Sequence, residues 1–150
     1  MENVRSDWTE LAKQFQASLY KKVFAGHDVS DYIDNLVTET RAGKHDDLLI
    51  YQKRLRRPLS HYVKNVPPHV KAARLADQYY QSIGKRPRYQ NRGTICYVIT
   101  TAGAQPVEHQ TSPLDYEHYI FKQLAPVADA ILPFVQLDFY RMITRQLNLF

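Results

Sequence analysis

Basic charge is concentrated in the middle of this chain, and that concentration limits how the segment can fold. Eleven of the twenty lysine and arginine residues lie between Tyr51 and Arg92, where Asp77 is the single acid. Acids outnumber bases on both sides of the segment, so the formal charge of +5 conceals a local excess of ten. Like charges within a Debye length of roughly 8 Å repel each other, which favours a surface that meets a polyanion. The alternative is a solvated cationic face that only aids solubility.

The length and composition predict one folded domain. The chain has 150 residues, a mass of 17.5 kDa and 44% hydrophobic residues, enough to bury a core. Its single cysteine, Cys96, excludes an intrachain disulfide and agrees with a reducing cytoplasm. The longest mostly apolar stretch, Ala125 to Val135, is interrupted by two prolines and an aspartate, so we expect no membrane span.

Apolar periodicity predicts two helices near the N-terminus. Apolar residues recur at three- and four-residue steps from Trp8 to Val23, with Ser6 or Asp7 available as the N-cap. A second amphipathic helix follows and ends at Gly43. We expect residues 1–43 to form an acidic helical hairpin that serves as scaffold.

The remainder of the chain predicts short strands between helices. Leu48 to Tyr51 and Val107 to Gln110 fit strands, and Thr94 to Thr101, rich in β-branched and aromatic residues, fits one best. Pro58 begins a brief helix, and the pair Pro67 and Pro68 precedes a longer helix from His69 to Ile83. Helical periodicity resumes at Pro113. The predicted fold class is α+β, predominantly helical.

No arrangement of residues indicates catalysis or metal binding by this chain alone. Asp46 and Asp47 are adjacent, so they diverge in either a strand or a helix. The six histidines show no metal-ligand spacing, and neither Ser60 beside His61 nor the lone Cys96 forms a nucleophile arrangement. Phosphate-loop and dinucleotide-binding glycine patterns are both absent. We therefore predict no catalytic residue and no metal or cofactor site.

Binding chemistry is well represented in the basic segment. The guanidinium group of one arginine can donate two parallel hydrogen bonds to the oxygens of a phosphate. Tyrosine, asparagine and histidine donors add contacts that fix the register of the protein on the DNA without reading bases. Ten residues are the predicted contacts with a DNA backbone: Lys53, Arg54, Arg56, Arg57, Tyr62, Lys64, Asn65, His69, Lys71 and Arg74.

Four ordered motifs resemble the thumb domain of family B DNA polymerases, and the likeness to the C-terminal end of bacterial members covers essentially the whole chain. The motifs are Leu49-Ile50-Tyr51-Gln52-Lys53-Arg54-Leu55 through Tyr62-Val63-Lys64, Pro68-His69-Val70, Arg92-Gly93-Thr94-Ile95-Cys96-Tyr97-Val98-Ile99, and Asp115-Tyr116-Glu117-His118-Tyr119-Ile120. Their order and spacing match as well.

The resemblance implies a thumb domain over residues 1–145, with a duplex-contacting segment at 48–92 and a small β element with C-terminal helices at 93–145. It implies that the chain holds primer-template duplex DNA during replication or repair, in the cytoplasm of a bacterium and associated with the nucleoid. The family's palm, fingers and exonuclease motifs are not in this sequence. Nucleotidyl transfer and its Mg²⁺ would therefore belong to the remainder of the polymerase, and this chain would be a fragment of it.

The C-terminal residues 146–150 resemble the short peptide by which bacterial polymerases bind the ring-shaped sliding clamp. The predicted contacts are Gln146, Leu147, Leu149 and Phe150. Each large apolar side chain left in water forgoes roughly 1.5 to 3 kcal/mol of burial, which favours a partner pocket. Alternatively, these residues complete the last helix and pack on the core of the domain.

A different class of function also fits the charge pattern. The basic stretch would bind an acidic protein partner, and the apolar tail would be a general docking peptide. This non-enzymatic interaction module is the alternative to DNA binding.

Overall fold

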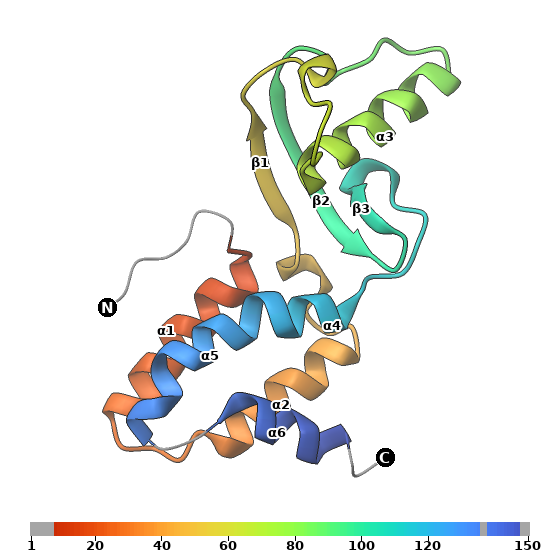
Figure 1. Ribbon diagram of the computed structural model, residues 1–150. Helices are drawn as coiled ribbons and strands as arrows, with labels where there is room; N and C mark the ends of the chain where they lie inside the picture. The colour runs from red at the N-terminus through yellow and green to blue at the C-terminus, as the bar shows by residue number, and fades with distance from the viewer. Residues whose placement is uncertain (1–7, 136–137, 148–150) are drawn as a thin grey trace. The chain divides into compact units, whose positions relative to one another are not determined.

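The computed structural model describes residues 8–135 and 138–147, which fall into two compact units (Figure 1). The helical unit combines Met1–Leu49 with Tyr116–Phe150, and the sheet unit is Ile50–Asp115. Helices dominate, and one three-stranded antiparallel sheet accompanies them, which confirms the predicted α+β class. No helix among the described residues has the length and apolar composition needed to cross a bilayer.

The helical unit is built from both ends of the chain. Its elements are α1 (Glu10–Phe24), α2 (Ser30–Arg41), the 3-10 turn η1 (Asp46–Leu48), α4 (Tyr116–Tyr119), the π-helical turn η4 (Ile120–Leu124), α5 (Ala125–Ile131), the 3-10 turn η5 (Leu132–Val135) and α6 (Phe139–Leu147). Helix α1 packs along α5, while α2 packs against α4 and α6 (Figure 1). The two helices of the predicted hairpin thus pack mainly on the C-terminal helices.

Thr9 fixes the start of α1. Its hydroxyl accepts a hydrogen bond from the Ala12 N–H at 3.4 Å, as an N-cap residue does. The Thr9 N–H and hydroxyl in turn donate to Oε1 of the buried Gln123, at 2.8 and 3.1 Å. The caps predicted from the sequence, Ser6 and Asp7, lie outside the described residues. These bonds tie the first helix to a turn more than a hundred residues later.

In the sheet unit, one helix packs on a small antiparallel sheet. The strands β1 (Tyr51–Leu55), β2 (Gly93–Thr100) and β3 (Gly103–Pro106) are arranged in the order β1-β2-β3. Helix α3 (Pro68–Ser82) packs against all three strands, and the 3-10 turns η2 (Leu59–His61) and η3 (Val107–His109) flank the unit. Two of the predicted boundaries hold: proline occupies the first turn of α3, and Gly84 follows its end with φ +77°.

Two predicted strands are wrong in position. The strand predicted at Leu48 to Tyr51 begins only at Tyr51, as β1, and Leu48 ends the turn η1. The strand continues to Leu55 because these residues pair with β2, with Lys53 opposite Ile95. Val107 to His109 form a 3-10 turn, because the hairpin closes with the pair Thr100–Gly103 and the returning strand is complete at Pro106. The first shift places the basic residues on a strand, where the sheet fixes their spacing.

Candidate nucleic-acid interface

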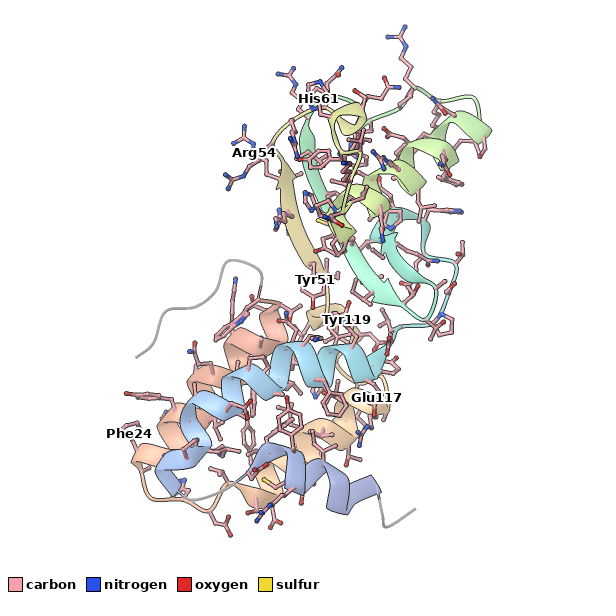
Figure 2. All side chains as sticks on the ribbon, in the orientation of Figure 1. Phe24, Tyr51, Arg54, His61, Glu117 and Tyr119 are labelled. Carbon is pink, nitrogen blue, oxygen red and sulfur yellow. The ribbon has the colours of Figure 1, made fainter. Side chains whose placement is uncertain are left out.

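The outer strand β1 carries exposed basic side chains between two buried residues. Tyr51 and Leu55, at its two ends, are buried, whereas the three residues between them are exposed. The Tyr51 ring stacks on Tyr97 across the β1–β2 pair, with centroids 5.2 Å apart. Lys53 and Arg54 therefore project from a strand that is held at both ends, and Figure 2 shows Arg54 extending outward from β1.

The buried side chains of Tyr62 and His69 pack against each other near the start of α3. Their side chains are 9% and 5% exposed, and the rings meet edge to face with centroids 6.2 Å apart. The Arg57 guanidinium lies over the Tyr62 ring, 4.4 Å from its centroid. Arg74 Nη2 donates to the carbonyl oxygens of Leu59 and Tyr62 at 2.8 and 2.6 Å, fastening the segment around η2 to the helix.

The surroundings of His69 favour the uncharged form of its imidazole. Burial lowers the pKa of its imidazole below the ordinary value, and the positive charge of Lys53 lowers it further. A neutral, buried ring packs and positions its neighbours but brings no positive charge to a phosphate. Tyr62, His69 and the half-buried Arg74 thus make interior contacts that hold the exposed cations in place.

The other predicted contacts are exposed. They are Lys53, Arg54, Arg56, Arg57, Lys64, Asn65 and Lys71. Lys64 and Asn65 lie in the turn before α3, where Asn65 adopts φ +49°, a left-handed conformation that asparagine tolerates better than most residues. Lys71 follows in the first turns of α3. We call these seven residues the basic face, as a name for the set, because Lys53 and Arg54 follow each other on β1 and therefore point to opposite sides of the sheet.

The single acid of the basic segment does not neutralise this face. Asp77 is 6% exposed, and its carboxylate accepts the backbone N–H of Arg88 at 2.7 Å and that of Tyr89 at 2.9 and 3.1 Å. Glu108, beyond the segment, pairs with Arg88 at 3.7 Å and accepts the Tyr89 hydroxyl at 2.7 Å. Asp77 and Glu108 thus both bind the 88–89 loop, and Glu108 also accepts the Tyr80 hydroxyl.

Arg92 and two arginines of the basic face line the same open hollow, which has a volume of about 760 Å³. Its lining is Arg54, Leu55, Arg56, Asn91, Arg92, Gly93 and Thr94. Arg92, Asn91 and Thr94 are not among the contacts predicted from the sequence, because only the pairing of β1 with β2 brings this part of the chain to the β1 residues. We call this the arginine hollow. Asn91 also lines a second hollow of about 400 Å³, together with Arg74, Asp77 and neutral residues that include Ser60, Gln78, Gln81 and Gln90.

No group of three or more potential metal ligands occurs among the described residues. A group of exposed basic residues on a small α+β unit is typical of proteins that bind the backbone of nucleic acids. The chain is homologous to family B DNA polymerases. It is 53% identical to DNA polymerase II of Escherichia coli (strain K12) over all 150 residues.

Two further relatives extend this homology to archaea. The chain is 34% identical to DNA polymerase 2 of Aeropyrum pernix over 145 residues, covering 89% of this chain and 17% of that protein. The solved structure of the family B DNA polymerase of Pyrobaculum calidifontis matches 83% of this chain and 18% of that one, with a TM-score of 0.63 and 30% identity. No protein-family model matches the chain. The chain spans 19% of the length of the Escherichia coli protein.

Proposed function

We propose that this chain is the thumb of a family B DNA polymerase and holds primer-template duplex DNA by its phosphate backbone. The observation that carries the proposal is the basic face: its cations are exposed, while the only acid between Tyr51 and Arg92 is buried against backbone amides. Such a surface grips phosphates without reading bases. The homology to family B DNA polymerases supports the same role.

The chemistry of DNA synthesis is assigned to other parts of the polymerase. Nucleotidyl transfer needs acidic metal ligands for Mg²⁺, and the described residues contain no such cluster. The partners of this chain are then the duplex product and the palm, fingers and exonuclease parts of the enzyme. This role places the protein at chromosomal DNA in the bacterial cytoplasm, in replication or repair.

The salt dependence of duplex binding tests the proposal. If about five phosphates are neutralised, the logarithm of the affinity falls with the logarithm of the salt concentration at a slope near roughly −4.5. The measurement is a fluorescence anisotropy titration of a labelled duplex of arbitrary sequence at several KCl concentrations. A flat salt response would reject phosphate gripping. Tighter binding to a polyglutamate peptide than to the duplex would favour the alternative interaction module.

The C-terminal peptide is proposed as a contact with a sliding clamp. Helix α6 includes Gln146 and Leu147, whose side chains lie outside the described set, as do residues 148–150, which include Leu149 and Phe150. Deleting residues 146–150 is expected to weaken binding to a bacterial sliding clamp at least tenfold, because the apolar side chains that would fill the clamp pocket are removed. Duplex affinity is expected to stay within twofold. Surface plasmon resonance on immobilised clamp measures the first, and loss of both affinities together would contradict the proposal.

A further inference from the structure

The arginine hollow lies at the adjoining ends of the paired strands β1 and β2. Arg54 and Thr94 are direct partners across the two strands, and Leu55 and Gly93 form the last pair. Arg56 and Arg92 follow one residue beyond, on opposite strands, each two residues from a member of the first pair. Three arginines and a threonine, from the adjoining ends of two paired strands, therefore line one hollow.

This arrangement costs stability unless an anion fills it. Like charges placed opposite each other on neighbouring strands repel, and the hollow has no acid in its lining. Arg54, Arg56 and Arg92 are exposed, and no ion pair within the described residues involves any of them. Planar guanidinium groups bind phosphate oxygens in pairs, so three of them can surround one phosphate.

Glycine at position 93 supports the same geometry. Gly93 adopts φ +129°, and a Cβ atom there would meet Tyr89 Cδ1 at 3.3 Å. The chain can therefore turn closely past the Tyr89 ring into β2, which leaves Arg92 and Thr94 on either side of the turn. Tyr89 itself is held by its N–H bonds to Asp77. The hollow is thus fixed from the interior.

We propose that the arginine hollow is a single-phosphate site, in which Arg54, Arg56 and Arg92 together hold one phosphodiester of the DNA backbone. The inference rests on the proposed function and deepens it, because it gives Arg92 a binding role and states how many phosphates the three arginines neutralise. Thr94 and Asn91 add neutral donors to the same group.

The salt slope of duplex binding counts neutralised phosphates, so it separates one shared phosphate from three. The variants are Arg92→Ala and the triple variant Arg54→Ala/Arg56→Ala/Arg92→Ala. The matched control is Arg141→Ala, which removes the same charge from an exposed residue of the helical unit, outside the duplex-contacting segment. Each 150-residue variant is titrated against the labelled duplex at several KCl concentrations, and circular dichroism verifies that it is folded.

If the three arginines share one phosphate, the salt slope of duplex binding should change little in the variants. Arg92→Ala should weaken binding several-fold at nearly unchanged slope, because the two remaining arginines still neutralise the phosphate. The triple variant should reduce the slope by about 0.9, and the control should match the wild type. If the slope of the triple variant is reduced by about 2.7, the three arginines contact three separate phosphates and the inference is overturned. No reduction in that slope would overturn it as well. A flat slope in the wild-type chain would instead overturn the proposed function.

Discussion

Alanine in place of Asp77 is expected to lower the free energy of unfolding by about 2 to 4 kcal/mol. The carboxylate accepts two backbone N–H groups, from Arg88 and Tyr89, at 2.7 to 3.1 Å. Hydrogen bonds to a charged group contribute about 1.5 to 3 kcal/mol each, and a buried donor left without a partner costs about 1 to 3 kcal/mol. Urea unfolding followed by circular dichroism measures the loss.

Two substitutions serve as controls for Asp77. Asp77→Asn keeps an oxygen where Oδ1 accepts both N–H groups, so a loss of only about 1 kcal/mol is expected. Gln78→Ala changes the next, exposed residue of α3 and should stay within about 0.5 kcal/mol of the wild type. If Asp77→Ala is as stable as Gln78→Ala, the carboxylate does not hold the 88–89 loop.

Removing the four cations of the basic face that lie outside the arginine hollow is expected to weaken duplex binding about a hundredfold or more. The quadruple variant replaces Lys53, Arg57, Lys64 and Lys71 by alanine, and all four side chains are exposed. If each of the four contacts a separate phosphate, the salt slope should change from about −4.5 to about −0.9. The remaining slope is the contribution of the one phosphate in the arginine hollow. Anisotropy titrations at several KCl concentrations measure both quantities.

A second quadruple variant separates local contacts from overall charge. Lys13, Lys21, Lys44 and Lys122 are exposed residues of the helical unit, and their replacement by alanine removes the same four charges. This variant should keep the wild-type slope, with at most a few-fold loss of affinity at low salt through weaker long-range attraction. Equal losses in the two variants would mean that net charge, and not the basic face, carries the binding.

Local signals predicted the helices well because helix boundaries depend on neighbouring residues. Proline before His69 and glycine at position 84 bounded α3 correctly, and a glycine at position 43 ended α2. The position of His69 could have been found in the same way. His69, Ala73 and Ala76 recur at steps of four and three residues and are all buried, so the histidine lies on the apolar side of α3.

Strand pairing supplied what no local pattern contained. The register between β1 and β2 joins residues about forty positions apart, and it alone brings Arg92 beside Arg54 and Arg56. The sequence showed that Asp77 is the single acid of its segment, but it could not show which amides the carboxylate binds. The basic character of the candidate site and the burial of His69 were therefore predictable, whereas the partners of Asp77 and the place of Arg92 were not.

The place of β1 in the strand order has a consequence for association between copies of the chain. In the order β1-β2-β3, β1 is an outer strand, with backbone groups on one side that could pair with another strand. Lysine and arginine on such a strand discourage that pairing by repulsion. The same cations that we assign to DNA would thus also oppose pairing between β1 strands of two copies, and replacing them by neutral residues would remove both the phosphate contacts and this repulsion.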